Sequence, residues 1–295
     1  MGVKTAARAG AEKAAQRKAS RLLILSTGAG NLTSEVEGRL RAMFADYLVT
    51  SFDPKLDFER LITPRARVVV AGGDGSVEFV VRKLADTKHP VGIVSLGTFN
   101  NFALALGLPA GLDKQIEVVM TGRPRPITVG RVNGTVFLEA CLVGLFGETI
   151  ALGETLKDRK YGSLATDLGS VLSAKRFSYE LEGDLNGSGS AMSLVFTNTS
   201  SIGSQLPVGD STPRDHYLEF AVLAGRTRSD IAARALASAL LMKHAEEGLG
   251  QVFRFQKVSV RTRPRVRVYA DNMLVGRTPA TVTAEVSAVK VILPP

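Results

Sequence analysis

The N-terminal part of the chain repeats one pattern: a short apolar run, a glycine-containing loop and a stretch with helical spacing. After the loop "GGDGS" (72–76), apolar residues recur at the spacing of one helix face, at Val77, Val80, Val81 and Leu84. Unbroken apolar strands that alternate with helices are typical of a parallel sheet covered on both faces. We therefore expect an α/β domain over residues 21–126. The apolar runs are "RLLILS" (21–26), "ARVVVA" (66–71) and "PVGIVS" (90–95).

After about residue 125 the pattern changes, because apolar and polar positions alternate along longer strands that follow one another directly. Alternation with period two indicates strands with one buried face. The Asn-Gly pairs at 133–134 and 186–187 are typical turn residues between antiparallel strands. This pattern predicts an all-β domain, a β-sandwich over residues 127–286, interrupted by helices near 156–174 and 228–247.

Two glycine-rich loops of the first domain offer backbone N–H groups without side-chain bulk, "STGAGN" (26–31) and "GGDGS" (72–76). Such groups at the start of a helix favour a negatively charged guest, above all phosphate. Asp74 would repel phosphate, so we interpret it as a Mg²⁺ ligand, a water-mediated metal contact or a proton acceptor beside the phosphoryl group. The alternative is a tight turn in which Asp74 caps the next helix.

The first loop does not complete the dinucleotide-binding pattern of dehydrogenases. Thr33 stands where the third glycine of that pattern is due, and no acidic residue ends the next strand. A nucleotide-binding P-loop is also excluded, because no Gly-Lys-Ser/Thr sequence occurs. The three histidines are scattered, so the sequence does not indicate zinc.

The net charge of +9 favours an anionic partner, which could be a nucleotide, a nucleic acid or an acidic membrane surface. Residues 1–20 form a basic extension, interpreted as a solvated tail or as an arm that contacts anionic lipid. One expected strand carries an arginine at every second position, namely Arg261, Arg263, Arg265 and Arg267. We interpret these side chains either as a basic binding face or as a solvated face of the sheet. No aromatic residues are interleaved for base stacking, so no nucleic-acid partner is expected.

Cysteine usage and hydropathy bear on the setting of the protein. The single cysteine, Cys141, lies in an apolar stretch, which excludes a disulfide framework and indicates a reducing, cytoplasmic environment. No apolar run is long enough to span a bilayer, so any membrane contact is expected to be peripheral, at the inner face.

The segments "GGDGS" and "LGTFNNFALALGLP" (96–109) together resemble the diacylglycerol kinase catalytic-domain family, which includes bacterial lipid kinases and sphingosine kinases. The resemblance implies an ATP-binding α/β domain like that of NAD kinases, a β-sandwich domain, and a site in the cleft between them. It also implies that a closing strand at about 287–295 returns to the first domain. The implied reaction is the ATP- and Mg²⁺-dependent transfer of the γ-phosphoryl group to a lipid hydroxyl of the diacylglycerol type. A homodimer is compatible with this family resemblance.

The family motifs carry over to this chain residue by residue. A metal site is implied at Asp215, with Thr212 and Tyr217 as carbonyl donors, although Arg214 and His216 depart from the family pattern there. The implied nucleotide contacts are Ser26, Thr27, Gly28, Ala29, Gly30, Thr50, Gly72, Gly73, Asp74, Gly75, Ser76, Val77, Glu78, Thr98 and Asn100.

Three departures from the family pattern concern catalysis. Phe99 replaces a glycine, Asn101 replaces an aspartate, and Met273 stands where the family keeps a glutamate that accepts the substrate proton. Methionine cannot accept a proton, which leaves Asp74 and Asp271 as the expected catalytic carboxylates. Two interpretations stay open: a working kinase with altered chemistry, or a degenerate relative that binds nucleotide or lipid without turnover. A third, NAD kinase, shares "GGDG" but lacks a recognisable Asn-Glu dinucleotide-binding motif.

Overall fold

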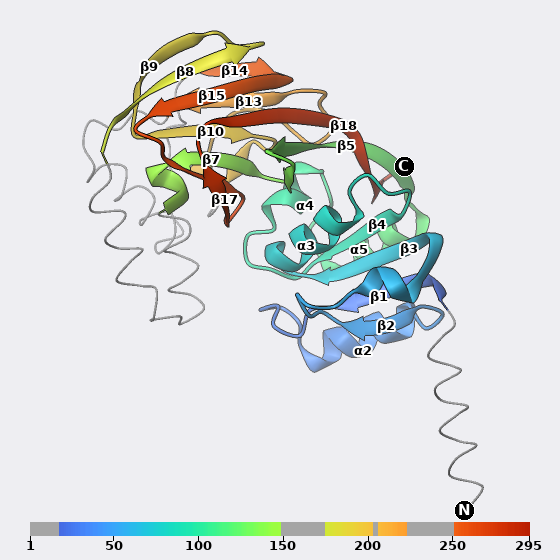
Figure 1. Cartoon of the computed structure of the whole chain (residues 1–295). Helices are drawn as coiled ribbons and strands as arrows, with labels where there is room; N and C mark the ends of the chain where they lie inside the picture. The colour runs from blue at the N-terminus through green and yellow to red at the C-terminus, as the bar shows by residue number, and fades with distance from the viewer. Residues whose placement is uncertain (1–17, 149–174, 203–205, 223–250) are drawn as a thin grey trace, which may run out of the picture. The chain divides into compact units, whose positions relative to one another are not determined.

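The structure is a computed structural model that describes residues 18–148, 175–202, 206–222 and 251–295 (Figure 1). Its contacts divide the chain into two units. Unit 1 is Met1–Asn100, Leu108–Arg125 and Val289–Pro295, and unit 2 is Asn101–Gly107 and Pro126–Ala288. Most of the predicted basic extension, and the helices predicted near 156–174 and 228–247, lie outside the described residues.

Unit 1 contains a parallel sheet with the strand order β2-β1-β3-β4-β18. The register places Leu25 beside Ala71 and Gly72 beside Ser95, so β1, β3 and β4 end together at one edge. The closing strand contributes its last residues here, where Val291 pairs with Val91. The strands are β1 (Ala19–Leu25), β2 (Leu48–Ser51), β3 (Ile62–Gly72), β4 (Pro90–Ser95) and β18 (Ala280–Leu293).

Helices cover this sheet and explain its unbroken apolar strands. Leu23 and Leu25 of β1 share a core with α2 and α5, whereas α3 packs on β3 and β4. All four residues from Leu22 to Leu25 are buried, as expected for a strand with both faces covered. The helices of unit 1 are α2 (Ser34–Met43), the 3-10 helix η1 (Phe58–Leu61), α3 (Asp74–Leu84) and α5 (Leu112–Thr121).

Unit 2 consists mainly of antiparallel strands in two sheets. One sheet has the order β14-β13-β10-β7-β16-β17, and the other contains β18, β15, β8 and β9, with β5 paired to β18 and β6. Side chains of both sheets form one core, in which Phe177 and Val260 join Phe196 and Phe220. The predicted fold class, an N-terminal α/β part followed by a β part, is therefore confirmed.

The elements of unit 2 include the short helix α4 (Asn101–Ala105), which begins at the first residue of this unit. Its strands, together with β5, which starts in unit 1, are β5 (Arg123–Val132), β6 (Thr135–Phe137), β7 (Ala140–Gly144), β8 (Phe177–Gly183), β9 (Gly187–Ala191), β10 (Ser193–Thr197), β11 (Ser201–Ile202), β12 (Leu206–Pro207), β13 (Leu218–Val222), β14 (Val252–Phe255), β15 (Lys257–Arg263), β16 (Arg267–Ala270) and β17 (Met273–Arg277).

The segment Asn101–Gly107 groups with unit 2 although it precedes residue 126. Its contacts explain this, because the Asn101 side chain donates to Glu139 at 3.1 Å and Arg214 donates to the Leu106 carbonyl at 2.9 Å. The chain therefore passes from unit 1 to unit 2 within the motif "GTFNNF", between its two asparagines.

The predicted Asn-Gly turn at 133–134 is confirmed, since Asn133 and Gly134 both have positive φ, 47° and 88°, between the paired residues Val132 and Thr135. The arginine-rich strand is not continuous, and that prediction is wrong. β15 ends at Arg263 and β16 begins at Arg267, because Pro264 lacks the N–H group that a ladder needs.

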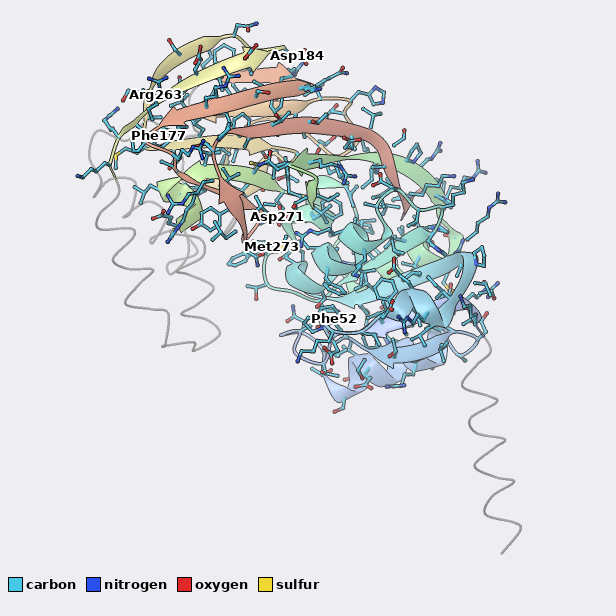
Figure 2. All side chains as sticks on the ribbon, viewed as in Figure 1. Phe52, Phe177, Asp184, Arg263, Asp271 and Met273 are labelled. Carbon is cyan, nitrogen blue, oxygen red and sulfur yellow. The ribbon has the colours of Figure 1, made fainter. Side chains whose placement is uncertain are left out.

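Asp184 carries a prediction on pH dependence (Figure 2). Its carboxylate accepts hydrogen bonds from the backbone N–H groups of Gln256 and Lys257, both at 2.8 Å, and these bonds lower its pKa. A lowered pKa in the folded state stabilises the protein above the unfolded value of about 4, and this contribution is lost as pH falls through the folded value. Between pH 7 and pH 3, wild type should therefore lose more stability than Asp184→Asn, as measured by urea midpoints. Parallel losses would contradict this.

Candidate functional site

Three loops of unit 1 meet at the edge where the parallel strands end. Ser26 N–H donates to the Ala71 carbonyl at 2.9 Å, and Leu96 N–H donates to the Gly72 carbonyl at 2.8 Å. The loops after β1, β3 and β4 thus begin side by side, although they are far apart in sequence. The structure brings together the predicted residues 26–30, 72–76 and 98–100 at this edge.

Asp74 ties two of these loops together. Its Oδ2 atom accepts the Asn100 N–H at 2.9 Å. Asn100, which has a positive φ of 54°, also holds Gly97 through its side chain, accepting from the Gly97 N–H at 2.9 Å and donating to the Gly97 carbonyl at 3.0 Å. Gly73 is the N-cap of α3 and Asp74 is the first residue of the helix, so Asp74 does not occupy the cap position.

The close approach of the loops requires glycine at two positions. A Cβ atom at Gly97 would lie 2.8 Å from the Gly73 Cα and 2.8 Å from the Asn100 Oδ1. A Cβ atom at Gly72 would lie 2.8 Å from the Ser26 Cβ. Both distances are shorter than a normal van der Waals contact, so side chains at these positions would push the loops apart.

The start of α3 is open on its outer side. A Cβ atom at Gly28, Gly30 or Gly75 would meet no described atom within 4 Å. Beside them, the buried Ser76 hydroxyl donates to the Ser26 hydroxyl at 2.8 Å, which joins the first loop to the first turn of α3. The helix dipole and the N–H groups of its first turn favour a negative group in such an open space.

The other predicted nucleotide residues occupy varied positions. Thr50 lies on β2 opposite Ile24 and is half-buried, and Thr98 is exposed. The side chains of Val77 and Glu78 are buried within unit 1, and Glu78 approaches Arg82 at 3.9 Å. Val77 and Glu78 are thus part of the packing of α3. Thr27 and Ala29 lie in the turn after β1, where Ala29 N–H donates to the Ser26 carbonyl at 3.0 Å.

Two residues of this loop cluster were missed as site residues, Asn31 and Gly97. The Asn31 side chain donates to the Gly97 carbonyl at 3.0 Å, and its N–H donates to the Leu96 carbonyl at 3.2 Å. Asn31 therefore connects the first and third loops. Its position at the end of "STGAGN" was the available signal.

Asp271, predicted as a catalytic carboxylate, lies in the turn between β16 and β17 in unit 2 (Figure 2). Its carboxylate accepts the N–H groups of Leu138, Glu139 and Ala140, with closest distances of 3.0, 2.9 and 3.1 Å. The residue is buried and has a positive φ of 53°. These bonds assign Asp271 a role in holding the segment between β6 and β7, whereas its catalytic role stays a prediction.

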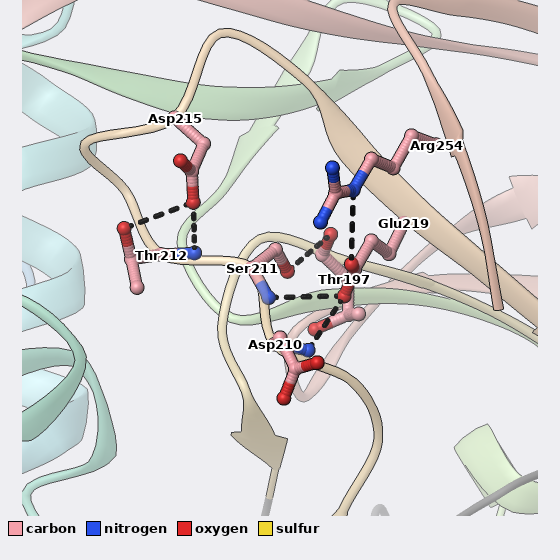
Figure 3. A network of polar contacts seen from close by, with 7 residues as sticks. All are labelled: Thr197, Asp210, Ser211, Thr212, Asp215, Glu219 and Arg254. Atoms are coloured by element: carbon pink, nitrogen blue, oxygen red, sulfur yellow. Dashed lines mark hydrogen bonds and ion pairs between the residues drawn. The ribbon is translucent and has the colours of Figure 1, made fainter.

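The predicted metal residues lie in the loop before β13 (Figure 3). The Asp215 Oδ2 atom accepts the Thr212 N–H at 2.8 Å and the Thr212 hydroxyl at 3.0 Å, and Asp215 N–H donates to the Thr212 carbonyl at 2.9 Å. A metal here would compete with these bonds. Tyr217 lies under Arg254, 4.6 Å from ring centroid to guanidinium carbon. Desolvation and the charge of Asp215 raise the pKa of its hydroxyl.

A second carboxylate stabilises the same loop (Figure 3). Glu219, 1% exposed, accepts the N–H groups of Asp210 and Ser211 at 2.9 and 3.0 Å, and its other oxygen lies 3.7 Å from Arg254. Among the residues that the structure describes, no group of three or more His, Cys, Asp or Glu side chains could hold a metal ion. A magnesium site among the described residues would therefore use at most two such side chains.

Two further side chains of unit 2 bear on the chemistry. Met273, in the position of the family's glutamate, is 37% exposed. Cys141 is buried, and burial, with the charge of Asp271 as a second cause, raises the pKa of its thiol far above the usual range. Cys141 is therefore an inert core residue.

Residues 26–132 match the family model of the diacylglycerol kinase catalytic domain, and this range contains all three loops. Residues 26–132 belong to the diacylglycerol kinase catalytic-domain family. A diacylglycerol kinase of Bacillus subtilis (strain 168) is 28% identical over 236 residues, 77% of each chain. A diacylglycerol kinase of Staphylococcus carnosus (strain TM300) is 34% identical over 83 residues, about a quarter of each chain.

The fold is also that of solved structures. A diacylglycerol kinase from Bacillus anthracis str. Sterne is similar with a TM-score of 0.66 and 19% sequence identity, covering 93% of this chain and 97% of that chain. At this identity the similarity concerns the fold. No helix among the described residues is long and apolar enough to cross a membrane.

Proposed function

We propose that the chain is an ATP-dependent lipid kinase, which transfers the γ-phosphoryl group of ATP to a hydroxyl of a diacylglycerol-like lipid. The observation that carries this proposal is the loop cluster of unit 1, where the open start of α3 lies beside Asp74 and the loops after β1 and β4. Backbone N–H groups and the dipole of α3 would hold the phosphates. The position of Asp74 suits the reacting end of the nucleotide, where charge changes during transfer.

Magnesium would enter with the triphosphate. The donors of the loop cluster fit this mode, because Mg²⁺ is usually bound by one or two carboxylates together with substrate phosphates and water. Asp74 would hold the ion, which neutralises charge on the phosphoryl oxygens. Asp215, with Thr212 and Tyr217, remains a second proposed metal site, provided that its bonds within the loop open.

The substitution Gly75→Val tests phosphate binding at α3. A Cβ atom added there would meet no described atom within 4 Å, so the protein should stay folded. It would occupy the space proposed for the phosphates, and the Kd for Mg-ATP measured by calorimetry should rise at least about tenfold, or 1.4 kcal/mol. Gly38→Val on the exposed face of α2 is the matched control, since a Cβ atom there also meets nothing within 4 Å. Equal affinities of the two variants would contradict the proposed phosphate position.

Turnover separates this proposal from a non-catalytic binding protein. ADP release by the wild-type protein should depend on diacylglycerol in detergent micelles. ATP binding without ADP release over a panel of lipid alcohols would support the degenerate relative, for which Phe99 and Met273 are the motivation. Phosphorylation of NAD would support the NAD kinase alternative. Absence of ATP binding would contradict the kinase and NAD kinase proposals.

A further inference from the structure

Basic side chains gather at one end of unit 2, where the chain passes from one sheet to the other. β15 ends at Arg263, and β16 begins at Arg267. β8 starts at Phe177 and pairs with β15 so that Ser178 lies opposite Arg263, and Figure 2 shows Phe177 and Arg263 at this end. β17 ends at Arg277, which pairs with Arg267. The residues of this basic corner are Lys175, Arg176, Arg263, Arg265, Arg267 and Arg277.

The basic corner differs in charge balance from the strand that leads to it. On β15, Arg261 lies 3.6 Å from Glu182, and both side chains are exposed. Among the described residues, three exposed arginines of the corner form no ion pair, namely Arg263, Arg265 and Arg277. The structure thus divides the alternating arginines, because Arg261 lies on a solvated face with a carboxylate beside it, whereas the corner keeps an excess of positive charge.

Two arginines of the corner lie directly opposite each other. Arg267 and Arg277 are partners in the antiparallel pair of β16 and β17. Like charges at such positions are destabilising. Arg267 lies 3.9 Å from Glu148, and Arg277 donates to the Arg265 carbonyl at 3.2 Å. An anionic group bound at the corner would reduce the repulsion between the two guanidinium groups.

An exposed leucine shares the face that carries these two arginines. The register shifts between Val268 and Tyr269, so that Tyr269 pairs with Leu274. Val268 belongs to the core between the sheets, so Arg267 and Tyr269 project from the opposite face of β16. Their partners Arg277 and Leu274 project from that face too. Leu274 is 54% exposed, on the last strand of its sheet among the described strands.

We propose that the basic corner, together with Leu274, is the surface through which the chain docks on a membrane of anionic phospholipids. Guanidinium groups bind lipid phosphates, and an apolar side chain enters the boundary between headgroups and acyl chains. Docking gives the proposed kinase access to an acceptor that lies in a bilayer. The inference rests on the proposed function in this respect only, because lipid binding requires no turnover.

A nucleic acid fits this surface less well than a membrane. It would use the arginines, but single strands are bound by aromatic side chains on which the bases stack. The aromatic residues beside the corner, Phe177 and Tyr269, are buried, with 2 and 3% exposure. The exposed apolar side chain on this face is the aliphatic Leu274. A membrane interface accepts both the charges and the leucine.

The first test removes the charges of the corner. We expect the triple variant Arg263→Gln, Arg265→Gln and Arg277→Gln to bind vesicles of phosphatidylcholine and phosphatidylglycerol about 100-fold more weakly than wild type, as measured by co-sedimentation. Vesicles of phosphatidylcholine alone should bind both proteins equally weakly. The matched control removes three exposed positive charges of unit 1 and should bind like wild type; it carries Lys114→Gln, Arg123→Gln and Arg125→Gln.

A smaller variant keeps the test valid if the triple variant is not obtained folded. The double variant Arg263→Gln with Arg265→Gln leaves the bond from the Arg277 side chain to the Arg265 carbonyl in place. It should still lose vesicle binding about 30-fold.

The second test separates a membrane from a soluble polyanion. Leu274→Ser should weaken vesicle binding about fivefold, because a half-exposed leucine can no longer enter the interface. Its affinity for single-stranded DNA, used as a polyanion probe, should not change. The matched control is Leu48→Ser on β2 of unit 1, a leucine that is 42% exposed on the edge strand of its sheet, and it should bind vesicles like wild type.

The outcomes separate this inference from the proposed function. Equal vesicle binding by wild type and the triple variant would overturn the docking surface. Loss of vesicle binding only in a variant of the N-terminal extension, with Lys4, Arg8 and Lys13 replaced by glutamine, would overturn it in favour of that extension. Binding to DNA but not to vesicles would overturn it in favour of a nucleic acid. Vesicle binding that depends on the corner, without lipid-dependent ADP release, would support the docking surface and overturn only the kinase proposal.

Discussion

Replacing Asp74 by asparagine is expected to lower kcat/KM for lipid-dependent ADP release about 10³-fold while the protein stays folded. The side-chain oxygen of asparagine can still accept the Asn100 N–H, so the contact between the loops after β3 and β4 is kept. The negative charge is lost, and with it the proposed hold on magnesium. Groups that act on charge in the transition state are commonly worth about 10²- to 10³-fold in rate.

The matched control is Asp113→Asn in the first turn of α5. Asp113 also belongs to unit 1, and its side chain is 76% exposed in a surface pair with Arg39. Asp113→Asn should keep the wild-type melting temperature, because surface ion pairs contribute about 0–1 kcal/mol. Asp74→Asn should keep it because the bond from the Asn100 N–H is retained. Equal turnover of Asp74→Asn and wild type would show that the Asp74 charge takes no part in the reaction. Loss of folding in Asp74→Asn would instead assign Asp74 a structural role.

Local patterns in the sequence predicted the elements of unit 1 because each element and its loop are encoded within about 20 residues. The run "ARVVVA" became β3, and Val77, Val80, Val81 and Leu84 became the buried face of α3. Parallel strands leave their following loops at one edge, so the meeting of the loops could be inferred from the parallel sheet that the apolar strands predicted.

Contacts between distant residues could not be inferred in this way. The choice between a helix cap and a loop contact for Asp74 depends on the position of Asn100, 26 residues later. The structural role of Asp271 could not be inferred for the same reason, because the N–H groups that it accepts belong to residues more than 130 positions away. The alternating arginines wrongly predicted one continuous strand, because Pro264 interrupts that strand.

The substitution Asp271→Ala is expected to destabilise unit 2 by about 3–5 kcal/mol. It removes the acceptor of three buried N–H groups at residues 138–140, and hydrogen bonds to charged groups contribute about 1.5–3 kcal/mol each without being additive. Alanine is also disfavoured at the positive φ of 53°. Urea unfolding followed by circular dichroism should show the loss, and the amides of 138–140 should lose protection against hydrogen exchange.

Asp271→Asn separates this structural role from the catalytic role that the sequence predicted. Asparagine tolerates the positive φ and keeps one oxygen acceptor for the amides of 138–140, so it should destabilise the protein less than alanine does. If the Asp271 carboxylate were the proton acceptor, the asparagine variant would lose turnover at nearly wild-type stability. If it instead holds the segment 138–140, any loss of turnover should follow the loss of amide protection in the two variants. Full stability of Asp271→Ala would contradict the structural assignment.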